Sequence, residues 1–91
     1  MMALKRDMRL TEMRIGQKGT ITKIAGGAGS LAKLEALGIR IGAEVVKKSA
    51  LIARGPVIVA IGGTEIAMGY GMAQKIRVEV DEREDIAYRQ S

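Results

Sequence analysis

Few side chains in this sequence could do chemistry. The 91 residues include no Cys and no His, which excludes thiolate chemistry, a Ser-His or Cys-His nucleophile pair, and a zinc site with nitrogen or sulfur ligands. The six Met side chains could bind soft metals. Thioethers are also good gap-fillers, however, in a core that has no Phe and no Trp. We therefore expect a protein that is not an enzyme and that uses no metal or cofactor.

A second candidate for chemistry is a carboxylate cluster formed by Asp81, Glu82, Glu84 and Asp85. Carboxylate oxygens could hold a hard cation such as calcium. Arg83 lies among them, however, and the segment has no glycine that would form a tight binding turn. We interpret residues 81–91 as a charged, solvated C-terminal tail.

A glycine pattern, Gly27-x-Gly29-x-x-Ala32, formally matches a dinucleotide-binding fingerprint, with Glu44 further along the chain. A helix over residues 30–37 would be about 12 Å long. A parallel crossover would have to run back along a strand of about 20 Å. Nothing downstream repeats the alternation of strands and helices that a doubly wound sheet needs. We interpret the pattern as a loop that bends into a short helix.

The net charge of +5 suggests either a solvated basic surface or an acidic partner. Five cations could form one basic face: Lys33, Arg40, Lys47, Lys48 and Arg54. Proteins that bind single-stranded nucleic acid normally stack bases on exposed aromatic side chains. Only Tyr70 and Tyr88 are available for that purpose, so we expect no nucleic-acid partner.

Local patterns predict short strands and one short helix. Thr11 would cap a helical turn over residues 10–13, ending before Gly16. Residues 19–24 read as a strand with a bulge or bend near Lys23. Residues 30–37 read as a helix capped by Ser30 and ended by Gly38. Four further strands are expected over residues 43–49, 57–61, 64–68 and 76–80. A Gly62-Gly63 hairpin turn joins the middle two, and a turn or single helical turn follows at 69–73.

The order of these elements predicts a mainly β domain, a small barrel of about five strands with one inserted helix. We place an N-terminal extension at residues 1–9, the barrel at 10–80, and the charged tail at 81–91. The longest apolar runs are too short to cross a bilayer. The first residues also lack the apolar core of a signal peptide, so we expect a cytoplasmic protein.

Three segments in their order and spacing resemble the ferrous iron transport A family, the FeoA domain. They are Ile15–Ile24, Leu34–Val45 and Gly63–Val78, and the resemblance covers about residues 10–80. The family pattern has a Leu-x-x-Leu-Gly helix end, here Leu34 to Gly38. Ile15 and Ile41 stand where the family often has Pro before the turn glycines Gly16 and Gly42.

The resemblance implies an SH3-like barrel with an inserted helix, and a regulatory role beside the ferrous iron transporter FeoB. On that basis the partner is the cytosolic GTPase part of FeoB, and the membrane is reached only through it. Homo-oligomers are also possible, since exposed strand edges can pair. Two alternatives are an SH3-like domain of a metal-dependent transcriptional regulator system and a basic RNA-binding barrel.

The helix is the predicted contact surface. An apolar arc of Leu31, Leu34 and Leu37 would be too wide for the barrel mouth to cover, and a leucine left uncovered would have a basic rim. Leu34 is the central prediction, because it is the first Leu of the family's helix-end element. The alternative is that all three leucines plug the barrel. The predicted partner-binding residues are Leu31, Lys33, Leu34, Leu37, Gly38 and Arg40.

Overall fold

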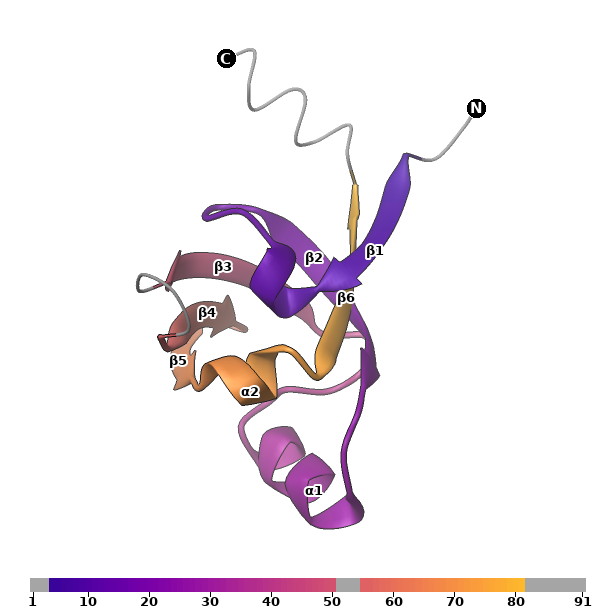
Figure 1. The fold of residues 1–91 in the computed structure, drawn as a ribbon, viewed down its shortest axis with the longest axis vertical. Helices are drawn as coiled ribbons and strands as arrows, with labels where there is room; N and C mark the ends of the chain where they lie inside the picture. The colour runs from indigo at the N-terminus through magenta and orange to yellow at the C-terminus, as the bar shows by residue number, and fades with distance from the viewer. Residues whose placement is uncertain (1–3, 51–54, 82–91) are drawn as a thin grey trace.

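The structure is a computed structural model of the chain, and it describes residues 4–50 and 55–81. Its elements in chain order are β1 (Lys5–Arg9), the 3-10 helix η1 (Leu10–Glu12), β2 (Lys18–Ile24), α1 (Ala28–Ala36), β3 (Glu44–Ala50), β4 (Val57–Ile61), β5 (Thr64–Met68), α2 (Tyr70–Ala73) and β6 (Ile76–Asp81). The strands form one antiparallel sheet in the order β1-β6-β2-β3-β4-β5 (Figure 1). The predicted mainly β architecture is therefore confirmed.

The core lies inside the curved sheet and consists almost entirely of aliphatic side chains. The largest fully buried ones are Leu10, Ile21, Ile39, Val45, Val59, Ile76, Val78 and Val80. Met8, Met13 and Met68 are also buried, while Met72 packs against the core from α2. The interpretation of these methionines as core fillers is confirmed. A flexible thioether can occupy the irregular spaces that would otherwise need an aromatic ring.

The strands flanking α1 decide the interpretation of the glycine pattern. Residues of β2 and β3 pair antiparallel, with Gly19 opposite Val45. Figure 1 shows α1 at one end of the sheet, in the connection between these two strands. A nucleotide-binding crossover joins parallel strands. The prediction that the glycine-opened helix is not such a crossover is confirmed.

Several local predictions agree with the structure. The bulge lies between Ile21 and Lys23, as expected. The β4–β5 hairpin turns at Gly62 and Gly63, whose φ angles of +58° and +82° are unfavourable for other residues. The expected bounds of β4 and β5 are confirmed.

Two predicted helix caps are wrong. The first helical turn begins after Arg9, not after Thr11, and the side chain of Glu12 accepts a hydrogen bond from the Arg9 backbone N–H at 2.7 Å. The long helix begins after Gly27 and includes Ser30, which was the expected cap. In both cases the chain turns earlier because the preceding strand or loop already supplies the extended residue that a cap position needs.

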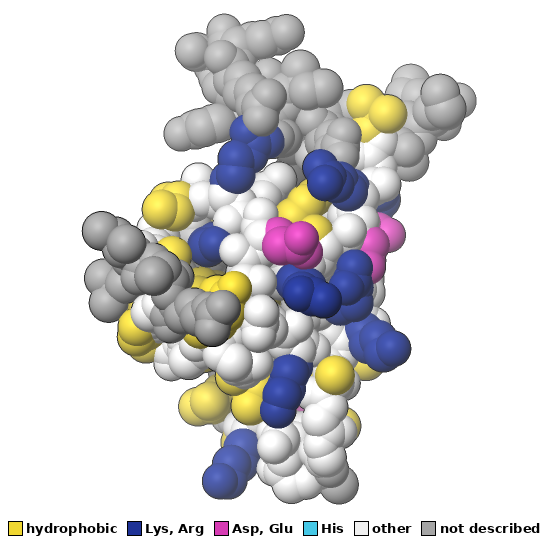
Figure 2. Space-filling model, in the orientation of Figure 1, with side chains coloured by type: hydrophobic (Ala, Val, Ile, Leu, Met, Phe, Trp, Pro, Cys, Tyr) yellow, Lys and Arg dark blue, Asp and Glu magenta, His cyan; other side chains and the backbone are white. Residues whose placement is uncertain are grey.

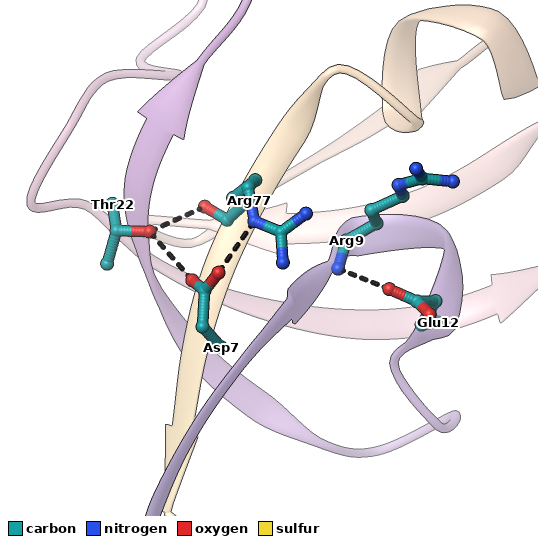
Figure 3. A network of polar contacts seen from close by, with 5 residues as sticks. All are labelled: Asp7, Arg9, Glu12, Thr22 and Arg77. Atoms are coloured by element: carbon teal, nitrogen blue, oxygen red, sulfur yellow. Dashed lines mark hydrogen bonds and ion pairs between the residues drawn. The ribbon is translucent and has the colours of Figure 1, made fainter.

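The sixth strand is the main addition to the predicted topology. Residues Lys5–Arg9 lie in the range assigned to an N-terminal extension, yet they form β1 and pair with β6. A polar network joins this strand to its neighbours (Figure 3). The Asp7 carboxylate lies 2.6 Å from Arg77 Nε and accepts a hydrogen bond from the Thr22 hydroxyl at 3.2 Å. The expected tail falls outside the described residues except for Asp81, which ends β6.

Candidate interaction surface

The motif that ends α1 determines which of its apolar side chains are buried and which are exposed. Gly38 takes φ +89°, and its N–H donates to the Glu35 carbonyl, while the Ile39 N–H donates to the Leu34 carbonyl. This pair of bonds is the Schellman arrangement, in which the residue after the glycine contacts the residue five positions earlier. Leu34 and Ile39 are accordingly both buried in the core. Leu37, at the cap, is left 56% exposed.

A tight turn follows directly and exposes a second large apolar side chain. The Ala43 N–H donates to the Arg40 carbonyl at 3.0 Å, and Gly42 has φ +92°. A positive φ at the third position of a four-residue turn is the signature of type II. Ile41 stands at the second position and is 64% exposed. The turn is fixed to β2, because the Gly42 N–H donates to the Ile21 carbonyl at 2.7 Å.

These two side chains border an open groove of about 870 Å³, which we call the helix-end groove. One wall carries Leu37, Arg40 and Ile41. The other wall is the β4–β5 hairpin at Ile61, Gly62 and Gly63. A groove with two exposed large aliphatic side chains beside an arginine has the composition of a protein-binding surface, where apolar and arginine contacts carry most of the binding energy.

The predicted contact residues fall into three groups. Leu37, Gly38 and Arg40 line the groove. Leu31 and Lys33 are exposed on α1 but do not line it. Leu34 is only 5% exposed and belongs to the core. The structure therefore removes Leu34 from the surface on which a partner could dock, because the Schellman bonds turn it inward with Ile39.

Most of the residues that line the groove were not predicted from the sequence. Ile41 and the Ile61–Gly63 segment were not among the predicted contact residues, although both line it. The signal for Ile41 was present, since a large aliphatic residue before a turn glycine occupies a position that points to solvent in a type II turn. The hairpin could not be found in this way, because only the tertiary fold brings it beside the helix end.

The predicted basic face is wrong at Lys47. This side chain is buried, and its ammonium donates to the backbone carbonyls of Thr11 at 3.0 Å and Met13 at 2.6 Å. Removal from water lowers the pKa of Lys47 below its usual value of 10.5. Lys33, Arg40 and Lys48 are exposed, and Arg54 lies outside the described residues.

Two features are absent from the described residues. No three His, Cys, Asp or Glu side chains lie together as a group that could hold a metal ion in residues 4–50 and 55–81. Within the same ranges, no helix has the length and apolar character needed to cross a membrane.

Comparison with known proteins identifies the family. The model of the FeoA domain matches residues 8–80. The chain belongs to the FeoA domain family. The family is associated with ferrous iron transport, and the resemblance seen in the sequence is confirmed. A relative, the Fe(2+) transport protein A of Methanocaldococcus jannaschii, is 39% identical over 64 residues, with 70% of this chain and 76% of that protein aligned.

Solved structures agree with this assignment. The crystal structure of an iron uptake regulatory protein, FeoA, is 33% identical and superposes with a TM-score of 0.74 over 80% of this chain and 96% of that one. A manganese-dependent transcriptional repressor superposes with a TM-score of 0.73 at 24% identity, over 89% of this chain and 44% of the repressor. The second likeness shows a shared fold alone. The predicted SH3-like fold of this FeoA domain is confirmed.

Proposed function

We propose that this FeoA domain protein is a cytoplasmic accessory protein of ferrous iron uptake. In this proposal it acts by binding the cytosolic GTPase part of a FeoB-type transporter and is not itself an enzyme. Membership of a family associated with ferrous iron transport supports the setting. The small size and the lack of His and Cys favour a protein that acts through a partner and does not hold the metal itself.

The helix-end groove is the proposed contact surface, and the exposure of Leu37 and Ile41 is the observation that carries it. The backbone that carries these side chains is fixed by hydrogen bonds at the helix end and in the turn, so little backbone freedom is lost when a partner covers them. Arg40, in the same wall, can bind a carboxylate or a backbone carbonyl of the partner. Of the predicted contact residues, Leu37, Gly38 and Arg40 are retained, and Ile41 replaces Leu34.

The test compares two isoleucines in matched surroundings. Ile15 and Ile41 are 62% and 64% exposed, and each precedes a turn glycine with φ near +90°. The GTPase part of the FeoB-type transporter from the same organism would be titrated with the wild type, Ile41→Ser and Ile15→Ser. We expect Ile41→Ser to weaken binding about tenfold or more, since burial of one large aliphatic side chain contributes about 1.5–3 kcal/mol. Ile15→Ser should bind like the wild type.

Two outcomes count against parts of the proposal. Equal binding by the two variants and the wild type would exclude the groove as the contact surface. No binding by the wild type would exclude the transporter part as the partner.

The fold shared with a manganese-dependent repressor supports a second candidate, a domain that works with a metal-dependent transcriptional regulator. Binding to such a regulator from the same organism, and not to the transporter, would favour that candidate.

A further inference from the structure

The outer face of the sheet carries a row of positive charges on three adjacent strands. Arg77 of β6 lies opposite Arg9 of β1 on one side and opposite Lys23 of β2 on the other. Residues directly opposite each other on neighbouring strands project from the same face. We call these three residues the cation row. The pairing of β2 with β6 continues beyond the strands to Lys75, whose carbonyl accepts the Ala25 N–H at 2.8 Å. Lys75 is exposed and adds a fourth positive charge beside the row.

The positive charges of the cation row exceed the negative charges that the described residues place against them. Of the three guanidinium nitrogens of Arg77, only Nε bonds to Asp7, at 2.6 Å. No hydrogen bond or ion pair in the described part of the chain uses the terminal nitrogens of Arg77, the guanidinium of Arg9 or the ammonium of Lys23. Two other carboxylates lie nearby: Glu12 accepts from the Arg9 backbone N–H at 2.7 Å, and Glu79, two residues along β6 from Arg77, lies 3.6 Å from the Lys5 ammonium. Like charges on directly opposed strand positions destabilise a sheet, so the row fits an anion that residues 4–50 and 55–81 do not supply.

The row is also accessible. Arg9 and Lys23 are exposed, and the side chain of Arg77 is 38% exposed. Figure 2 shows dark-blue side chains gathered over the β1 and β6 side of the molecule, with magenta carboxylates beside them. Among the described residues, strands β1, β2 and β6 expose no large hydrophobic side chain. The surface is therefore suited to electrostatic recognition, separate from the apolar helix-end groove.

We propose that the cation row binds an acidic, extended peptide segment of a partner protein. Arg9 and Lys23 are separated by two interstrand spacings, about 10 Å in total. Carboxylates on alternate residues of an extended peptide are about 7 Å apart, so two of them fit within the row. The free edge of a guanidinium pairs with both oxygens of a carboxylate. The row is too short to follow a nucleic-acid backbone and has no aromatic side chain for stacking. It is also at the lower limit of the cation clusters that bind anionic lipid surfaces.

The test uses a fluorescein-labelled decapeptide with Glu at alternate positions, and a matched peptide with Gln in place of Glu. Binding would be measured by fluorescence anisotropy at low and high salt. We expect the Arg9→Gln/Lys23→Gln protein to bind the Glu peptide at least about fivefold more weakly than the wild type. The Lys33→Gln/Arg40→Gln protein loses the same charge elsewhere and should stay within about twofold of the wild type. Binding should weaken as salt rises.

Four results would overturn the proposal. The first three are no binding of the Glu peptide by the wild type, equal binding of the Gln peptide, and an equal loss of binding in both double variants. The fourth is binding of a single-stranded oligonucleotide or of phosphatidylglycerol vesicles that depends on the cation row and is tighter than binding of the Glu peptide. Circular dichroism and thermal unfolding would show that both double variants are folded, as expected for exposed side chains. The peptide assay contains no transporter, so its outcome is independent of the proposed function.

Discussion

Lys47 is the residue whose role depends most on its surroundings. It lies in β3, where its backbone N–H donates to the Gln17 carbonyl and its own carbonyl accepts the Gly16 N–H. The side chain adds two bonds, to the carbonyls of Thr11 and Met13. One residue thus joins the segment that connects β1 to β2 with the body of the sheet. The buried ammonium satisfies carbonyls that the 3-10 helix and the residue after it leave unpaired.

The lowered pKa of Lys47 predicts how stability changes with pH. The unfolded chain holds the Lys47 proton up to about its usual value of 10.5, whereas the folded chain releases it at lower pH. Between these two values the unfolded state binds more protons, so the free energy of unfolding contributed by this group rises as pH rises. The neutral amine keeps two N–H groups and can still donate to both carbonyls.

The measurement is urea unfolding of the wild type and Lys47→Met at neutral pH and at about pH 10. At neutral pH we expect Lys47→Met to be less stable by about 1–3 kcal/mol, because one buried and one partly buried carbonyl lose their donor. The wild type should gain stability relative to the variant at the higher pH. Lys48→Met, in which the next and exposed lysine is changed, should show neither effect. A difference that shrinks as pH rises would contradict the prediction.

At the scale of elements, the helix α1 is held by one buried leucine and a glycine stop. A nine-residue helix is too short to be stable alone. Leu34 anchors it in the core through the contact with Ile39 that follows from the Schellman motif. Leu31 and Leu37 leave the core because only one side of a short helix can face the barrel mouth. The predicted apolar arc therefore divides into a structural residue and exposed ones.

Truncation of Leu34 and of Leu37 to alanine would distinguish the buried residue from the exposed one. Leu34→Ala should lower the free energy of unfolding by about 2–5 kcal/mol, the range for a buried leucine that leaves a cavity. Leu37→Ala, at an exposed position of the same helix end, should change it by no more than about 0.5 kcal/mol. Thermal or urea unfolding would measure both. A similar loss in the two variants would mean that Leu37 also packs into the core.

The two type II turns offer a stabilising change. Ile15 and Ile41 occupy the second position of their turns, where proline fits. Each turn is closed by a backbone hydrogen bond, from the Gln17 N–H to the Arg14 carbonyl in the first and from the Ala43 N–H to the Arg40 carbonyl in the second. We expect Ile15→Pro and Ile41→Pro each to raise the free energy of unfolding by about 0.4–1 kcal/mol, since proline restricts the unfolded chain. Urea unfolding would measure the gain. Destabilisation by either proline would mean that the turn needs the lost N–H or a different φ.

At the scale of the whole molecule, the strands converge at Gly19. This residue is buried in β2 and lies opposite Val45 of β3 and Val80 of β6. A Cβ there would lie 3.1 Å from Val80 Cγ1 and 3.2 Å from the Glu79 carbonyl oxygen. The absence of a side chain at Gly19 therefore lets β2 and β6 approach closely at this point of the sheet.

A pair of glycine substitutions tests this close approach. Gly19→Ala should lower the free energy of unfolding by about 1–3 kcal/mol, because the backbone carbonyl of Glu79 cannot move aside easily. Gly29→Ala places the same methyl group in α1, where nothing lies within 4 Å. That change should raise stability by about 0.5–1 kcal/mol through helix propensity. If both variants were stabilised, the strands at Gly19 would have more room than the structure gives them.

The sequence by itself determined the elements whose signals are local. Periodic apolar residues and turn glycines predicted β4, β5, β6, the bulge in β2 and the end of α1, because each depends only on neighbouring residues and on backbone sterics. The absence of His and Cys also limits the chemistry open to the chain, whatever its fold. The family resemblance followed from the order and spacing of the same local signals.

Only the tertiary structure decided which side chains meet. It turned Lys47 and Leu34 inward, left Leu37 and Ile41 at the groove, and brought the β4–β5 hairpin beside the helix end. It also paired Lys5–Arg9 with β6 and so aligned Arg9, Lys23 and Arg77. These outcomes depend on strand register and on contacts between residues far apart in the chain. A period-2 or period-3.6 pattern tells which face of an element is apolar, but not what lies against it.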